Sequence, residues 1–161
     1  MTFFPARLMT LAILAVALIA GGCANPRKGL ESTIGGAATP GSAQDFQVNV
    51  GDRVFFTVDS SALSPEAQQT LTRQAQWLNQ YSQYNFVIEG HADERGTREY
   101  NLALGARRAA ATRDFLIAQG VNPQRIRTIS YGKERPVAVC DDISCWSQNR
   151  RAVTVLDGAG T

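Results

Sequence analysis

Strand-like and helix-like segments alternate along residues 47–157, and this alternation narrows the possible folds more than any other feature of the chain. Arg53–Val58 is β-branched and aromatic, which predicts a first strand. Ser64, Pro65 and Glu66 then supply an N-cap, a proline at the first helical position and an acid in the first turn. A helix is therefore expected to follow the first strand.

The same alternation continues through the middle of the chain. Asn85–Glu89 predicts a second strand, which opens at Gly90 into the polar loop His91–Gly96. A long helix is expected from about Arg98 to Gln119, because Gly120 follows it as a left-handed helix end.

Two further strands are predicted near the C-terminus, at Ile126–Tyr131 and Arg151–Leu156. The resulting order, β-α-β-α-β-β, favours an α+β domain in which helices pack on one face of a mixed sheet, as a two-layer sandwich. We expect this domain to span residues 47–157, with residues 158–161 as a short tail.

The N-terminus predicts an export segment over residues 1–22. Arg7 supplies a positive charge, and the uncharged run Leu8–Ala20 is shorter than the roughly 20 residues that span a bilayer. Small residues then lead to Cys23, which resembles the lipobox of bacterial lipoproteins, although Ala20 stands where leucine is commoner. That resemblance implies cleavage before Cys23 and a diacylglycerol anchor on its sulfur. A plain secretory signal with an incidental cysteine is the alternative.

Residues 23–46 are expected to form the lipidated N-terminus and a flexible tether. The segment is rich in Gly, Ala, Ser, Thr and Pro and has few large apolar residues. As a coil of about 20 residues it would have an end-to-end distance on the order of 25 Å. An arm without a tethering role has the same composition. Ala24 follows Cys23, so the inner-membrane retention signal that resembles Asp at this position is absent, and outer-membrane sorting is expected.

Charge argues against nucleic acid as a partner. The chain has 16 Lys and Arg against 14 Asp and Glu, and the two signs are interspersed. No basic face is indicated.

The long helix carries polar residues where a core face is expected. One apolar stripe contains Leu104 and Phe115, yet Asn101 and Arg108 fall on it too. Both polar residues lie in the half of the helix nearest the His91–Gly96 loop, so a polar pocket is predicted there. A second stripe would instead leave Arg108 nearer the surface, through Leu102, Ala106, Ala109 and Leu116.

Four ordered motifs closely resemble the peptidoglycan-associated lipoproteins, whose C-terminal domain is OmpA-like. They are Gly90-His91-Ala92-Asp93-Glu94-Arg95-Gly96-Thr97; Tyr100-Asn101 with Leu104-Gly105-Ala106-Arg107-Arg108-Ala109; Ser130-Tyr131-Gly132-Lys133-Glu134-Arg135-Pro136; and Asn149-Arg150-Arg151-Ala152-Val153. The resemblance covers about Val50 to Leu156 and includes the lipobox and tether. It implies non-covalent binding of the peptidoglycan stem peptide through meso-diaminopimelate.

The free end of meso-diaminopimelate carries an ammonium beside a carboxylate and needs two opposite partners. Asp93 matches the family residue expected to accept the ammonium, and Arg108 matches the one expected to clamp the carboxylate with its planar fork. The resemblance also places Asn101 at the pocket wall, Asp59 after the first strand, and the backbone of Ala92 in the loop.

Three other features invite separate interpretations. His91, next to two acids, suggests catalysis or a metal, but its spacing matches no established metal motif, so a hydrogen bond within the loop is expected. Asn149-Arg150-Arg151 is expected to tie helix ends and loops together. Cys140 and Cys145 bracket a loop where family members vary, and two such thiols in an exported protein usually form a disulfide. A zinc site from both cysteines and His91 would lack a fourth ligand.

The resemblance implies a binding and scaffold protein with TolB and TolA as partners, which links the outer membrane to the wall and helps draw it inward at cell division. An OmpA-like wall anchor outside the Tol system would share Asp93 and Arg108 but not the TolB surface. A wall hydrolase would need an activated Ser or Cys or a metal cluster, and none is visible in the sequence. We therefore expect neither an enzyme nor a cofactor beyond the lipid on Cys23.

Overall fold

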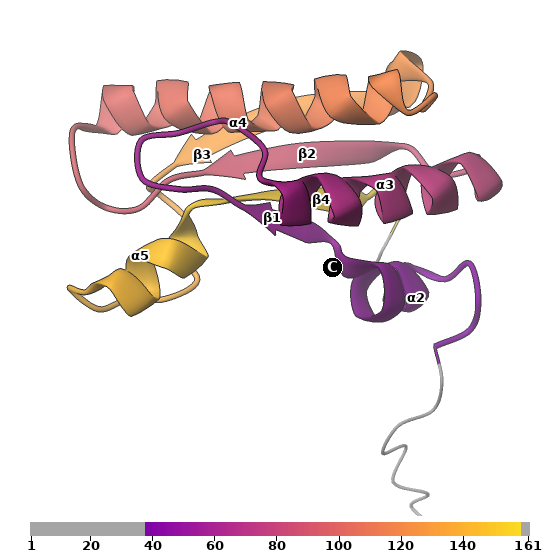
Figure 1. The fold of residues 1–161 in the computed structure, drawn as a ribbon, viewed down its shortest axis with the longest axis horizontal. Coiled ribbons are helices and arrows are strands. Elements are labelled where there is room, and N and C mark those ends of the chain that lie inside the picture. Colours follow the sequence, from indigo (N-terminus) through magenta and orange to yellow (C-terminus); the bar gives the residue numbers. More distant parts are fainter. Residues whose placement is uncertain (1–37, 159–161) are drawn as a thin grey trace, which may run out of the picture. The chain divides into compact units, whose positions relative to one another are not determined.

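The computed structural model describes residues 38–158, which form one α+β domain with helices packed on a four-stranded mixed sheet (Figure 1). The predicted signal segment, Cys23 and most of the predicted tether lie outside the described residues. None of the helices in the described part is long and apolar enough to cross a membrane.

The sheet has the strand order β1-β4-β2-β3. The strands are β1 (Arg53–Phe55), β2 (Phe86–His91), β3 (Ile126–Gly132) and β4 (Arg151–Leu156). β2 and β3 are parallel and are joined by a helical crossover, whereas β4 runs antiparallel to both β1 and β2. The sandwich and the order of its main elements are as predicted.

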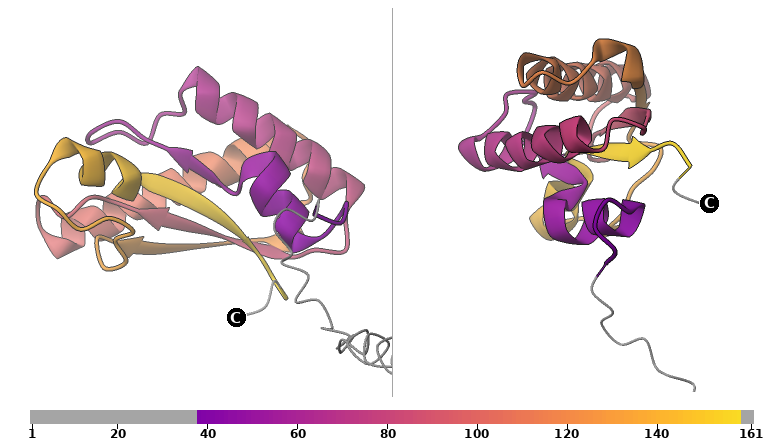
Figure 2. Two further views of the ribbon diagram at one scale, coloured as in Figure 1. Left: turned by 90° about the horizontal axis from the view of Figure 1, so that it is seen from below. Right: turned by 90° about the vertical axis from the view of Figure 1, so that its right-hand side faces the viewer.

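Two long helices cover the sheet, α3 (Pro65–Gln80) and α4 (Arg98–Ala118) (Figures 1 and 2). Ser64 caps α3 as expected, because its hydroxyl accepts a hydrogen bond from the backbone N–H of Ala67 at 3.2 Å. α4 ends at Ala118, and Gly120 follows with a φ of 88°, the left-handed conformation that the sequence predicts. The core lies between these helices and the sheet and includes Val54, Leu71, Ala75, Leu78, Phe86, Ile88, Ala109, Leu116, Ala152 and Leu156.

The folded domain begins before Gln47, which corrects the predicted boundary of the tether. A short helix, α2 (Ala43–Asp45), continues into the helical segment η1 (Phe46–Gly51). Phe46 is 1% exposed, and its ring lies 4.9 Å from that of Trp77. Asp45 accepts a hydrogen bond from the indole N–H of Trp77 at 2.8 Å. The burial of a single aromatic residue, Phe46, thus makes this segment part of the folded domain, although its composition otherwise resembles that of a linker.

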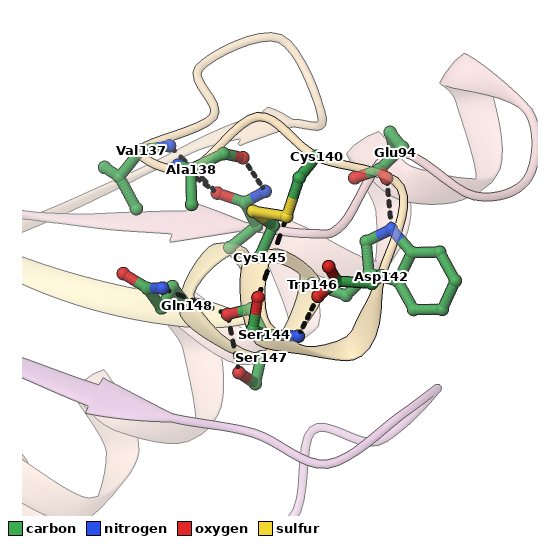
Figure 3. Close-up of a disulfide and its surroundings, with 11 residues drawn as sticks. Glu94, Val137, Ala138, Cys140, Asp142, Ser144, Cys145, Trp146, Ser147 and Gln148 are labelled. Atoms are coloured by element: carbon green, nitrogen blue, oxygen red, sulfur yellow. Dashed lines mark hydrogen bonds between the residues drawn. A yellow bond between two sulfur atoms is a disulfide. The ribbon is translucent and has the colours of Figure 1, made fainter.

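Two elements near the C-terminus were not predicted. A single turn, η2 (Pro123–Arg125), precedes β3, and a seven-residue helix, α5 (Ile143–Asn149), lies in the loop before β4. Asp142 caps α5 by accepting a hydrogen bond from the backbone N–H of Ser144 at 2.7 Å. The predicted Cys140–Cys145 disulfide is formed and joins Cys140, just before α5, to Cys145 in the first turn of that helix (Figure 3).

Candidate functional site

A cavity of about 320 Å³ opens beside the loop that joins β2 to α4. The segment that follows β1, this loop and the N-terminal half of α4 form its wall. The lining residues are Val58, Asp59, Asp93, Arg95, Gly96, Tyr100, Asn101, Leu104 and Arg108. Four of the five residues predicted for the site, Asp59, Asp93, Asn101 and Arg108, therefore meet in one cavity.

Close packing between β2 and α4 positions the loop. A Cβ atom at Gly90 would collide with the backbone carbonyl of Gly105, so only glycine allows the strand and helix to approach this closely. Lys133 holds the loop from outside, because its ammonium donates hydrogen bonds to the carbonyls of Glu94 (3.1 Å) and Gly96 (2.7 Å). The loop is thus fixed from two sides.

Arg108 is fully buried, with 0% of its surface exposed. Its guanidinium donates hydrogen bonds to the carbonyls of Ser60 (2.9 Å), His91 (2.7 Å) and Thr57 (3.1 Å). A guanidinium has five N–H groups, so two remain, the number that a bidentate carboxylate needs. β1 ends at Phe55, earlier than predicted, because the chain then leaves the sheet and presents the carbonyls of Thr57 and Ser60 to this guanidinium.

The environment of Arg108 combines burial with nearby charges of both signs. Burial lowers the pKa of Arg108 to about 10; Asp93 opposes this shift, and Arg150 adds to it. The side chain nevertheless stays charged at neutral pH. It also lies over the ring of Phe56, with 5.2 Å between the guanidinium carbon and the ring centroid.

Asp93 supplies the opposite charge and is 7% exposed. Its carboxylate accepts hydrogen bonds from Arg95 (2.6 Å from Nη2 and 3.2 Å from Nε) and from Arg150 (3.2 Å from Nη1). Burial by itself would raise the pKa of Asp93, but the hydrogen bonds from Arg95 and Arg150 outweigh it and hold the pKa below its ordinary value. Asp93 is therefore ionised at neutral pH.

Three further residues were predicted for the site, and their places differ. Asn101 is 2% exposed and lies on the wall, where its amide donates a hydrogen bond to the carbonyl of Arg95 at 2.7 Å. Asp59 accepts a hydrogen bond from the hydroxyl of Tyr100 and has a positive φ of 54°. Ala92 does not line the cavity; its backbone N–H donates to Gly132 at 2.8 Å and supports the loop from behind.

The predicted hydrogen bond of the His91 side chain is wrong. The ring is 1% exposed, and within residues 38–158 neither ring nitrogen has a hydrogen-bond partner. Burial lowers the pKa of His91 to about 4, and the positive charges of Arg151, Arg135 and Arg53 add to this effect. Only the carbonyl of His91 serves the site, as an acceptor for Arg108.

The Asn149-Arg150-Arg151 motif ties loops together as expected, with one addition. Asn149 bonds the backbone of Val137 and Ala138, and Arg151 donates to the carbonyl of Arg135 at 3.1 Å. Arg150 donates to the carbonyl of Phe56 at 3.0 Å and also to Asp93. The motif therefore reaches the site through Arg150.

Sequence reasoning missed several residues that shape the cavity: Val58, Arg95, Gly96, Tyr100, Leu104 and Arg150. Arg95 is the most consequential, and its position two residues after Asp93 in a tight loop was the available signal. Across residues 38–158, no group of three or more His, Cys, Asp or Glu side chains is arranged to hold a metal ion.

Comparison with known proteins defines the class first. Residues 55–150 match the OmpA family, and that match contains the cavity and the loop between β2 and α4. The C-terminal domain of MotB from Helicobacter pylori has the same fold, with a TM-score of 0.62, 24% identity and coverage of 66% of this chain and 84% of that one.

Three more similar proteins are named peptidoglycan-associated lipoprotein. The Mesorhizobium japonicum protein is 66% identical over 98% of this chain and 94% of its own length, and the Agrobacterium fabrum protein is 69% identical over 91% and 86%. The crystal structure of the Burkholderia pseudomallei protein has a TM-score of 0.64 and 43% identity over 66% of this chain and 90% of that one. This chain belongs to the peptidoglycan-associated lipoproteins of the OmpA family. The family is one of structural proteins, not enzymes, and needs no cofactor.

Proposed function

We propose that this lipoprotein binds peptidoglycan non-covalently through the free end of meso-diaminopimelate in the stem peptide. The observation that carries the proposal is that Asp93 and Arg108, which have opposite charges, both line the wall of one cavity. An ammonium and a carboxylate on one carbon atom require such a pair of opposite charges at short range. The relatives' name, peptidoglycan-associated lipoprotein, supports the same ligand class.

Each charge has a defined task in this proposal. Arg108 binds the ligand carboxylate through its two remaining N–H groups, and its bonds to three carbonyls keep the guanidinium in place. Because Arg108 is 0% exposed, a neighbouring side chain of the cavity wall must move aside before the ligand reaches it. Asp93 accepts the ammonium. Asp59 supplies a second negative charge, and Asn101 on α4 forms part of the cavity wall. The chemistry is recognition alone, with no bond made or broken.

Titration of two otherwise identical stem tripeptides, with meso-diaminopimelate or lysine at the third position, tests this function. Asp93→Asn should weaken binding of the diaminopimelate peptide by about 2 to 5 kcal/mol, because one partner of a desolvated pair is lost. Arg108→Lys should also weaken it, because an ammonium keeps the charge but loses the planar fork that binds a carboxylate with two hydrogen bonds. The lysine peptide lacks the carboxylate and should bind poorly to every variant.

Arg113→Gln, an exposed change on the same helix, is the matched control and should bind like the parent. Circular dichroism shows whether each variant is folded. Equal affinity of the folded parent, Asp93→Asn and Arg108→Lys proteins for the diaminopimelate peptide would refute the proposal.

The proposal extends to the cell envelope: diacylglycerol and palmitate on Cys23 anchor the protein in the outer membrane, with the domain in the periplasm. The domain then links this membrane to the wall and, with TolB and TolA, helps draw it inward at division. Cys23→Ala should release the protein into the soluble periplasmic fraction, and continued membrane fractionation would contradict the anchor.

Pull-down experiments test the partners, because purified sacculi and TolB should both retain the protein. Retention by sacculi alone would favour a wall anchor outside the Tol system.

A further inference from the structure

The Asp93 carboxylate already has all of its acceptor positions occupied. Oδ1 accepts from the backbone N–H of Arg95 at 3.3 Å and from its Nε at 3.2 Å, while Oδ2 accepts from Nη2 of Arg95 at 2.6 Å and from Arg150 at 3.2 Å. A carboxylate offers about four lone-pair positions. A ligand ammonium must therefore displace one of these donors before it can bind.

Arg95, not Arg150, is the donor that can leave. The Arg150 side chain is 7% exposed and also donates to the carbonyl of Phe56, so its departure would leave a buried charge and a buried acceptor without partners. The Arg95 side chain is 41% exposed and can move into solvent at little cost. Its guanidinium thus occupies the position on Asp93 that is open to exchange.

A second binding place for Arg95 lies directly beside the first. The guanidinium carbon of Arg95 is 4.1 Å from the ring centroid of Trp146, within cation-π range. Trp146 lies on α5, next to the Cys140–Cys145 disulfide, and its indole N–H donates to Glu94 (Figure 3). The ring is therefore fixed at the rim, where it can retain Arg95 after Arg95 leaves Asp93.

We propose that Arg95 is an internal competitor for the ammonium position and thereby determines which stem peptides the pocket accepts. The proposal rests on the function proposed above. A lysine side chain only exchanges one cation for another on Asp93, so little is gained. Meso-diaminopimelate displaces the same cation but adds a carboxylate, which Arg108 binds and which the released Arg95 attracts. The pocket thus rejects ligands that carry an ammonium alone.

Calorimetric titration of the two stem tripeptides against Arg95→Gln tests this role. Removal of the competing cation should tighten binding of the lysine peptide by about fivefold, the upper range for a partly exposed ion pair. Binding of the diaminopimelate peptide should change less, because the variant loses both a competitor and an attracting charge. The ratio of the two affinities should therefore fall.

Two matched variants separate this role from a general effect of charge. Arg95→Lys keeps a cation on Asp93 and should preserve most of the parent's affinity ratio. Arg98→Gln removes an exposed arginine three residues away that pairs with Glu134 outside the cavity, and it should leave the ratio unchanged. In the unaltered protein, the NMR signal of the Arg95 Nε–H should shift when the diaminopimelate peptide is added.

The possible outcomes distinguish this inference from the proposed function. A folded parent that binds neither peptide contradicts both. A parent that prefers the diaminopimelate peptide, combined with an unchanged ratio in Arg95→Gln or an unmoved Arg95 signal, overturns the role of Arg95 alone and leaves the Asp93 and Arg108 pair standing.

Discussion

Two arginines line the same cavity, and the fold holds them in opposite ways. Arg108 is 0% exposed and donates to three backbone carbonyls from two separate segments of the chain. The Arg95 side chain is 41% exposed, and within residues 38–158 its guanidinium donates hydrogen bonds to a side chain alone, the Asp93 carboxylate. Arg108 is therefore part of the folded framework, whereas Arg95 can be exchanged. Because of this difference, we expect substitutions of Arg108 to change the stability of the domain and substitutions of Arg95 to change which ligand it prefers.

Replacement of the framework arginine should have the largest effect on stability. Arg108→Ala removes three hydrogen bonds and leaves the carbonyls of Thr57, Ser60 and His91 beside a new cavity. We expect the free energy of unfolding to fall by about 3 to 5 kcal/mol, measured by urea denaturation. The exposed control Arg113→Ala should change it by less than about 0.5 kcal/mol. A loss below about 1 kcal/mol at Arg108 would contradict its framework role.

The burial of Asn101 and Arg108 on the long helix agrees with one of the two stripes that the sequence offered, for a physical reason. Asn101 and Arg108 stand on a helix stripe with Leu104, where polar residues cost free energy unless they are bonded. The buried face in fact combines both predicted stripes: Asn101, Leu104 and Arg108 come from the first, and Ala109 and Leu116 from the second. Burial of a charge on a periodic face is a local signal, so the pattern could reveal it.

The other half of the site, which contains the exchangeable Arg95, could not be predicted in the same way. Arg95 and Trp146 are far apart in the chain, and each resembles an ordinary exposed residue. Their contact depends on α5, a short helix that has little periodicity of its own. Phe46 was missed for a similar reason, because a single aromatic residue in a Gly- and Ser-rich segment acquires its role only through Trp77.

The stability of the domain should depend on pH, because the buried framework also contains His91. His91 has a pKa of about 4 in the folded chain against 6.5 for the ordinary group, chiefly because it is buried. Between these values the unfolded chain binds more protons than the folded one, so stability falls as the pH falls. We expect a loss of about 2 kcal/mol between pH 7 and pH 5.

His91→Phe keeps a ring beside Tyr131 and should remove most of this pH dependence. Urea denaturation of both proteins at each pH provides the measurement. Parallel pH profiles for parent and variant would show that His91 is protonated in the folded chain or that Glu89, 3.6 Å from its Nε2, compensates for the charge.

Loss of the disulfide should have the smallest effect on the free energy of unfolding. Cys140 and Cys145 close a short loop, so replacing both by Ser should lower stability by at most about 2 kcal/mol. Asn149 still bonds the backbone of Val137 and Ala138, which keeps α5 attached. Unfolding curves of oxidised parent and the double variant measure the difference. If the double variant lost as much stability as Arg108→Ala, the disulfide-bonded segment that contains α5 would belong to the framework.

A structure of the protein bound to the meso-diaminopimelate tripeptide tests the central claim most directly. The account predicts the ligand ammonium about 3 Å from the Asp93 carboxylate and the ligand carboxylate on Arg108. The Arg95 guanidinium should have left Asp93 and remained over Trp146. A peptide bound outside the cavity, with Asp93 still paired to Arg95, would contradict recognition by paired charges.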